Sequence, residues 1–321
     1  MTQCWKACLQ YSILLLLLTA GMFTATAQTE FDAIMMKKNN FCAGGMYGYS
    51  SWKNYWEGTL KRENLNLGTV STQMVAFMGN YGLSDKLNIL FGVPYVTTKA
   101  SAGTLHGQNG IQDGSLWLKW MPYEKTIGKG DLSLYAIAGV SAPLSNYVAD
   151  FLPVSIGLRS KTLSLRAMGD YQVGKFYVTA SGTYMFRSNI KIDRDAYYTT
   201  EMHYTNEVEM PDVLTFNVRT GYRYKNLIAD AFVDNQTTLG GFDITRNNMP
   251  FPSNEMNATR LGIYVKYELN AIRGLSLIGT GNYVVAGRNM GQATTISGGL
   301  FYILDFNKKK STSATPKKQT P

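Results

Sequence analysis

The stretch VLTFNVRTGYR, residues 213–223, shows the pattern that decides the fold. Leu214, Phe216 and Val218 are apolar, and a polar residue follows each of them, the last being Arg219. An alternation with a period of two is typical of a β-strand with one apolar and one polar face. In a soluble protein the apolar face lies on a core and the polar face in water. The remainder of the chain decides whether this strand follows that rule.

Strands of the same kind recur after residue 40, where helical periodicity is scarce and no apolar stretch is long enough for a membrane-spanning helix. Most have ten residues or more, which exceeds the roughly five or six of a typical globular strand and suits a tilted strand that crosses a bilayer. With no helix and no second apolar layer to cover the apolar faces, lipid must cover them. We expect twelve strands, at 43–51, 67–83, 87–99, 114–123, 131–143, 161–173, 176–189, 212–224, 227–242, 257–269, 275–286 and 293–306.

The connections between these strands alternate in length. Short turns are expected at 84–86, 124–130, 174–175, 225–226 and 270–274, and longer loops stand between them. This is the pattern of an outer-membrane barrel with periplasmic turns and extracellular loops, and a closed barrel satisfies every backbone polar group in hydrocarbon. We therefore expect an all-β fold, a transmembrane antiparallel up-and-down β-barrel of about twelve strands. Ten or fourteen strands are the alternatives, because the first two strands alternate poorly.

The N-terminus carries an export signal. Lys6 precedes an apolar run at about 11–23, and the small-x-small triplet 25–27 follows. This arrangement predicts a signal peptide over residues 1–27, since the apolar run is shorter than the roughly 20 residues of a spanning helix. We expect the mature chain to begin at Gln28 and to reach the bacterial outer membrane.

The net charge of +9 gives little support to nucleic-acid binding. Without Lys6 and the five lysines of the last fifteen residues, 25 Lys and Arg face 22 Asp and Glu. The remaining body is only slightly basic, and an exported chain meets little nucleic acid. We expect a barrel over residues 28–306 and a disordered periplasmic tail over 307–321, which is rich in Lys, Ser, Thr and Pro.

Three segments resemble the phenol-degradation meta-pathway family of outer-membrane, transporter-like β-barrel proteins. They are GLSDKLN at 82–88, VPYV at 93–96 and GIQDGSLWLKW at 110–120. Gln112 departs from the family pattern, which has a second glycine at that position. The resemblance covers about residues 80–120. It implies a barrel that passes small, often aromatic or hydrophobic, compounds, and it supplies no catalytic residues.

Catalytic and metal-binding patterns are weak. The only histidines, His106 and His203, fall in expected loops outside any serine-containing motif, so a lipid-modifying enzyme ranks third among the functions. The acidic loop 193–209 could hold a divalent cation through oxygen ligands, but its spacing fits no calcium loop, and a solvated acidic loop is the better interpretation. We expect no enzyme, no cofactor and no metal.

The lumen is where function is expected, because the polar residues of each strand face inward. We expect passage of small molecules, hydrophobic or aromatic ones among them; the alternative is a non-conducting structural or binding barrel whose lumen is filled by ion pairs. The expected partners are outer-membrane lipid, a small-molecule solute and the barrel assembly machinery. By parity the charged lumen-lining residues are Lys119, Arg166, Asp170, Arg187, Arg219, Arg223, Asp230, Asp234, Arg260, Lys266, Glu268 and Asp305.

Two arginines of the opening stretch should take part in a cross-strand ladder. Counting back from the turn at 225–226 places Arg223 opposite residue 228 and Arg219 opposite residue 232. Each guanidinium then lies diagonally within reach of Asp230, and that of Arg219 also within reach of Asp234. If these arginines line an open pore, their positive charge should favour anions.

Overall fold

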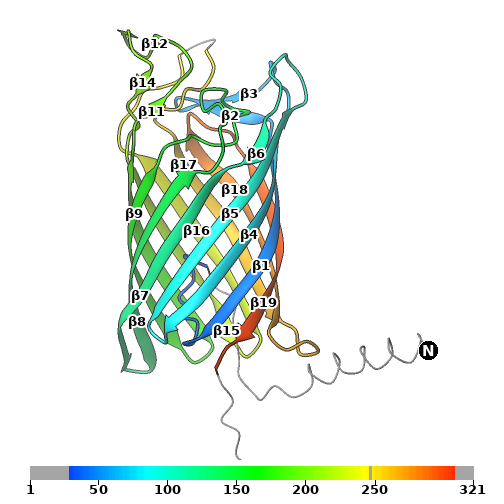
Figure 1. The fold of residues 1–321 in the computed structure, drawn as a ribbon, viewed down its shortest axis with the longest axis vertical. Helices are drawn as coiled ribbons and strands as arrows, with labels where there is room; N and C mark the ends of the chain where they lie inside the picture. Colours follow the sequence, from blue (N-terminus) through cyan, green and yellow to red (C-terminus); the bar gives the residue numbers. More distant parts are fainter. Residues whose placement is uncertain (1–28, 246–247, 308–321) are drawn as a thin grey trace, which may run out of the picture.

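Twelve long antiparallel strands close into a barrel in the computed structural model, which describes residues 29–245 and 248–307 (Figure 1). Strand β1 pairs with β19 on one side and with β4 on the other, so the barrel has no free edge. The predicted fold class and strand number are confirmed. The barrel strands are β1 (Asn40–Trp52), β4 (Val70–Ser84), β5 (Leu87–Ala100), β7 (Asp113–Ile127), β8 (Gly130–Pro143), β9 (Thr162–Val173), β10 (Phe176–Arg187), β15 (Val213–Tyr224), β16 (Leu227–Thr238), β17 (Asn257–Glu268), β18 (Leu275–Arg288) and β19 (Thr294–Asp305).

The strand boundaries follow the expected ones closely, with two clear differences. The predicted strand 227–242 ends at Thr238, four residues early. The predicted turn at 124–130 is mostly strand, because β7 and β8 continue to a turn of only two residues, 128–129. The predicted signal peptide, 1–27, and residues 308–321 of the predicted tail lie outside the described residues. In the part of the chain that the structure describes, no helix is long and apolar enough to span a membrane.

The outer face of the barrel is apolar, as the alternation in the opening stretch requires. Phe216 and Val218 are 54% and 49% exposed, and Ile263 on β17 is 62% exposed. Their neighbours Asn217 and Arg219 are buried inside the barrel. Apolar side chains outward and polar side chains inward reverse the arrangement of a soluble barrel and suit a lipid environment.

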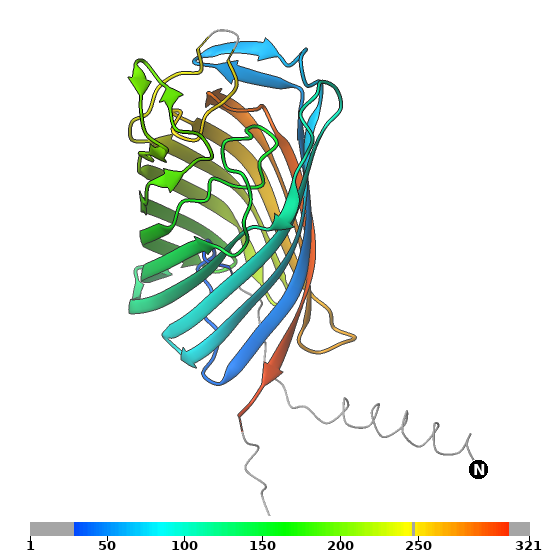
Figure 2. The same cartoon turned by 45° about the horizontal axis from the view of Figure 1, so that its top comes forward.

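Long loops gather at one end of the barrel, here called the loop end, and short turns at the other, the turn end (Figures 1 and 2). The loops form short strands that the sequence did not predict and pack into apolar clusters. Val154 and Ile156, in the loop after β8, are buried at the loop end, against Val70 and Val96 of the wall. The short strands are β2 (Asn54–Glu57), β3 (Leu60–Glu63), β6 (Asn109–Ile111), β11 (Ile190–Lys191), β12 (Tyr197–Tyr198), β13 (Met202–His203) and β14 (Glu207–Val208).

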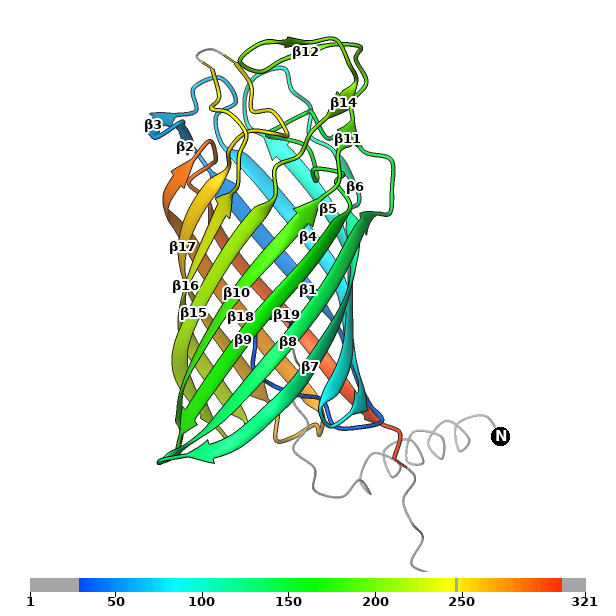
Figure 3. The same ribbon diagram turned by 90° about the vertical axis from the view of Figure 1, so that its left-hand side faces the viewer.

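Residues 29–39 run inside the barrel before the chain joins the wall at Asn40, as the dark blue trace shows in Figures 1 and 3. This stretch is called the N-terminal segment below. At the turn end the backbone N–H of Lys38 donates to the carboxylate of Asp85 at 2.9 Å. The N-terminal segment therefore enters the lumen from the turn end.

Candidate functional site: the lumen

Three ion pairs connect inward side chains of different strands on one side of the lumen. Arg223 on β15 bonds Asp170 on β9 at 3.0 Å, and Arg260 on β17 bonds Asp234 on β16 at 2.8 Å. Between them, Arg219 lies 3.8 Å from Asp230 across the β15–β16 pair. Each charge of these three pairs thus faces an opposite charge, which offsets part of its desolvation cost.

The predicted ladder is correct in register and partly correct in its pairs. Arg223 stands opposite Ile228 and Arg219 opposite Phe232, as the turn count predicted. Arg219 pairs with Asp230, but Arg223 turns the other way and bonds Asp170, two strands distant. Its guanidinium lies 4.0 Å above the ring of Tyr177 on the intervening strand β10. The turn count could not reveal this choice, because it set only the register of β15 with β16, and Asp170 lies beyond β10 on the other side.

The remaining predicted residues occupy different environments. Lys266 and Glu268 are buried on β17, whereas Arg187 is half-buried at the loop end of β10. Asp305 is exposed at the turn end of β19, where it accepts hydrogen bonds from Asn307.

Lys119 on β7 holds the N-terminal segment in the lumen. Its side chain is fully buried, and its ammonium donates to the carbonyls of Thr29 and Ile34 at 3.1 and 3.0 Å. It also bonds the carbonyl and the carboxylate of Asp32, the carboxylate at 3.1 Å. A buried ammonium needs such acceptors, since a charge without them is very costly to desolvate. Lys119 is therefore the main polar anchor of the segment.

Arg166 on β9 is the second anchor. Its guanidinium donates to the carbonyl of Glu30 at 2.6 Å and to the hydroxyl of Thr183 at 2.7 Å. It lies 4.1 Å above the ring of Phe31 and 5.3 Å from that of Trp117, both within the range of a cation–π contact. The planar cation is thus enclosed between aromatic rings and hydrogen-bonded at its edge.

Apolar contacts complete the binding of the segment. Met36 is buried in a cluster with Tyr264 and Phe301, and Ala33 in a second cluster with Met168. The hydroxyl of Tyr135 on β8 donates to the carbonyl of Ala33 at 2.8 Å. The polar side chains that bond residues 29–34 lie on β7, β8 and β9, and at the turn end the segment also bonds Gly82 and Asp85.

The opposite side of the lumen, formed by β18, β19, β1, β4 and β5, is uncharged. Between the two rims, none of the described inward side chains on these strands is Lys, Arg, Asp or Glu. One row of residues in register crosses it: Phe301 opposite Gly44, Gly44 opposite Met78, Met78 opposite Gly92, and Gly92 opposite Ser115. The ring of Phe301 lies over Gly44, where a Cβ would come within 2.6 Å of its Cδ1.

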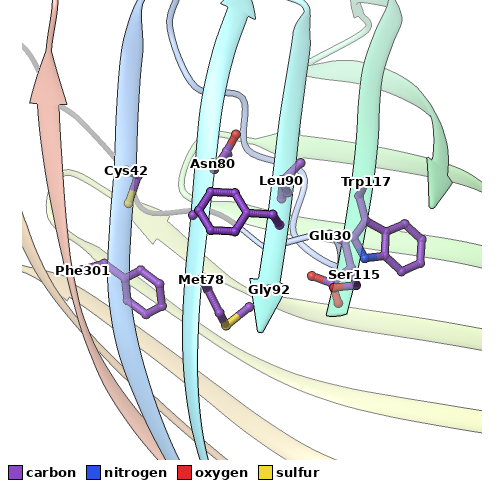
Figure 4. A pocket seen from close by; sticks show the side chains of 11 residues that line it. Glu30, Cys42, Met78, Asn80, Leu90, Gly92, Ser115, Trp117 and Phe301 are labelled. Carbon is purple, nitrogen blue, oxygen red and sulfur yellow. The ribbon is translucent and has the colours of Figure 1, made fainter. Parts of the chain in front are cut away.

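A cavity of about 40 Å³ remains between this row and the N-terminal segment (Figure 4). Met78, Gly92 and Phe301 line it from the uncharged side, and Trp117 and Glu30 line it from the other. The volume exceeds the roughly 10–15 Å³ that one water molecule needs. The N-terminal segment therefore leaves a small space beside the uncharged side at this level of the barrel.

The two histidines lie away from the lumen contacts described above. His203 stacks on Tyr197 at 4.8 Å and shares a hydrogen bond of 2.8 Å with the hydroxyl of Thr199 in the loop-end hairpin. In residues 29–245 and 248–307, no group of three His, Cys, Asp or Glu side chains is arranged to hold a metal ion. Asp150, on another loop, forms an ion pair with Arg194 of the acidic loop.

Sequence reasoning missed the N-terminal segment as an element of the lumen. Its signal was the apolar run Ile34–Met36 beside Asp32, between the expected cleavage site and the first strand. Lys119 was a second signal, because a lysine at an inward position in mid-strand needs acceptors, and the neighbouring strands 87–99 and 131–143 offer no carboxylate in mid-strand.

The fold has a counterpart among solved structures. A COG4313 outer membrane channel from Pseudomonas putida F1 superposes with a TM-score of 0.67 at 14% identity, covering 87% of this chain and 100% of that chain. The translocator domain of the autotransporter NalP from Neisseria meningitidis is more distant, with a TM-score of 0.44 at 12% identity, covering 83% and 88%. No family model and no curated protein sequence matches the chain. The first likeness shows the fold alone; that fold and the apolar outer face place the protein in the bacterial outer membrane.

Proposed function

We propose that this barrel passes small molecules through its lumen, and that the N-terminal segment controls the passage. The observation that carries the proposal is that the segment lies inside the lumen and is held there by side chains and not by strand pairing. Residues 29–38 contribute no strand to the wall, so they can move without breaking the ladder that closes the barrel. A filled lumen can in this way become an open one while the wall stays intact.

The solute class follows from the surface that the segment would uncover. Met78, Leu90, Trp117 and Phe301 line the gap. Apolar and aromatic side chains with a few polar groups are typical of sites for small molecules with apolar bodies. The resemblance to the phenol-degradation meta-pathway family points the same way, toward small aromatic or hydrophobic compounds.

A non-conducting barrel is the second candidate, and the ion pairs favour it. Asp170–Arg223, Arg219–Asp230 and Arg260–Asp234 tie the wall together, and the segment fills much of the remaining space. Such a lumen would support a structural or binding role in the outer membrane without transport. Neither candidate requires a catalytic group, a cofactor or a metal, and neither specifies a protein partner beyond the assembly machinery.

The test compares the mature chain with a variant that lacks residues 29–36, both in planar bilayers and in vesicles. We expect low conductance from the complete chain and a large increase from the variant, together with faster entry of a small aromatic solute such as phenol. Heat-modifiable migration checks that both barrels fold. If the shortened barrel folds and neither conducts nor admits solute, the non-conducting alternative replaces the channel.

A further inference from the structure

The two acidic residues of the N-terminal segment have different roles. The carboxylate of Asp32 is bonded to Lys119, and it also accepts hydrogen bonds from Thr29 and from the backbone N–H of Ile34. Glu30 uses only its backbone carbonyl, which accepts from Arg166. Within the described ranges, the carboxylate of Glu30 forms no ion pair and accepts no hydrogen bond. Arg166 and Lys119 attract this carboxylate only across a longer distance, so no direct contact holds it away from the space beside it.

That space is the cavity along the uncharged side of the lumen. Glu30 is the one charged residue among those that line it, and Figure 4 shows its side chain among them. Arg166 and Lys119 do not line the cavity. Arg166 is enclosed by Phe31 and Trp117, and Lys119 is fully buried among the carbonyls of the segment.

We propose that ions cross the barrel through this cavity while the N-terminal segment is in place, and that Glu30 makes the passage selective for cations. The inference rests on the proposed function, because it requires a lumen that conducts. A fixed negative charge at a constriction attracts cations and repels anions, and its field is strong where little water screens it. The ion-paired arginines of the other side contribute little to this choice, because each faces a carboxylate.

The size of the cavity separates two kinds of passage. At about 40 Å³ it accommodates water and small ions, whereas a phenol-sized solute needs the segment to move. Ion selectivity therefore reports on the barrel with the N-terminal segment in place, and solute flux reports on the barrel with the segment displaced.

The first experiment measures the reversal potential of the mature chain in a potassium chloride gradient across a planar bilayer. We expect a preference for potassium that falls severalfold in Glu30→Gln, since this substitution removes the charge and keeps the shape and the backbone carbonyl. Glu201→Gln is the matched control, because Glu201 is exposed in a loop at the other end of the barrel. An unchanged reversal potential in Glu30→Gln overturns the role of Glu30.

The second experiment fills the cavity from the wall. A Cβ at Gly92 would have Ser115 Oγ at 3.4 Å and Met78 Cγ at 3.8 Å, which are ordinary contacts, so Gly92→Leu should fold and occupy the gap. We expect its conductance to fall severalfold, and Gly92→Ala should give a smaller fall. Gly45→Leu is the control, because Gly45 is exposed on the outer face and has its nearest foreign atom 4.0 Å away.

The outcomes distinguish this inference from the proposed function. If Gly92→Leu folds and conducts as well as the wild type, the ions take another path and the inference is wrong, even if the shortened chain conducts. If neither the complete nor the shortened chain conducts, the proposed channel function is wrong. Should Gly92→Leu fail the heat-modifiability check, the sign of the change in Gly92→Ala decides.

Discussion

The two sides of the lumen are lined by different kinds of side chain. The side formed by β7, β8, β9, β10, β15, β16 and β17 carries the charges, and every ion pair described in the lumen lies there. The side formed by β18, β19, β1, β4 and β5 uses glycine, methionine and aromatic residues instead. The charged side holds the N-terminal segment by directed bonds, and the uncharged side leaves a gap beside it. The strands that bond residues 29–34 of the N-terminal segment are thus mostly different from the strands that border the cavity.

The largest effect should come from removing one partner of a buried pair on the charged side. Asp170→Asn keeps the shape but leaves Arg223 without its carboxylate, and it weakens the bond from Thr179. Such a break typically costs about 3–5 kcal/mol, because an uncompensated charge stays buried. Unfolding by urea in lipid vesicles measures the loss.

The matching change on the uncharged side is Met78→Leu, a nearly volume-conserving substitution that should cost less than about 1.5 kcal/mol. Equal losses in Asp170→Asn and Met78→Leu would mean that the ion pairs do not set the rigidity of the charged side, and the contrast between the two sides would fail.

The second prediction compares the two faces of strand β15. Val218→Arg places a charge in the lipid and should cost about 2–4 kcal/mol near the bilayer midplane. Thr215→Arg, on the inward face of the same strand, should be tolerated. Heat-modifiable folding distinguishes the two variants; similar defects in both would mean that the assignment of the faces is wrong.

The third prediction concerns the hydrogen bonds by which Lys119 binds the N-terminal segment. Lys119→Met removes the bonds to Thr29, Asp32 and Ile34. We expect a loss of about 1–3 kcal/mol in the attachment, equivalent to roughly 5–150-fold more time in the open state. Single-channel recording measures the open fraction, and Lys99→Met, at an exposed position, is the control. A lower open fraction in Lys119→Met would contradict the anchoring role.

The wall of the barrel could be predicted from sequence because its signals are local. Alternation with period two identifies each strand, and the residues of the turn at 225–226 fix the register of the strands beside it. The lumen could be predicted only in part, since the choice of partner depends on strands distant in sequence. Arg223 bonds Asp170 across β10, and Asp32 reaches Lys119 from before the first strand. The preference of an open pore for anions stays a prediction; in the structure each arginine of the ladder lies beside a carboxylate.

The smallest effect should come from an ion pair of the same chemistry outside the lumen. At the loop end, Arg288 bonds Asp243 at 2.8 Å, but the carboxylate of Asp243 is 43% exposed. Arg288 holds the pKa of Asp243 below its usual value, chiefly through their hydrogen bond. The pair therefore contributes its full stabilisation above the unfolded pKa of about 3.9, and this stabilisation is lost as the pH falls through the lower folded pKa.

Water screens the pair, so Asp243→Asn should cost about 0–1 kcal/mol at pH 7. The difference between wild type and Asp243→Asn in urea unfolding should shrink toward zero in acid. A loss at pH 7 as large as that of Asp170→Asn would show that burial in the lumen does not decide the strength of these pairs.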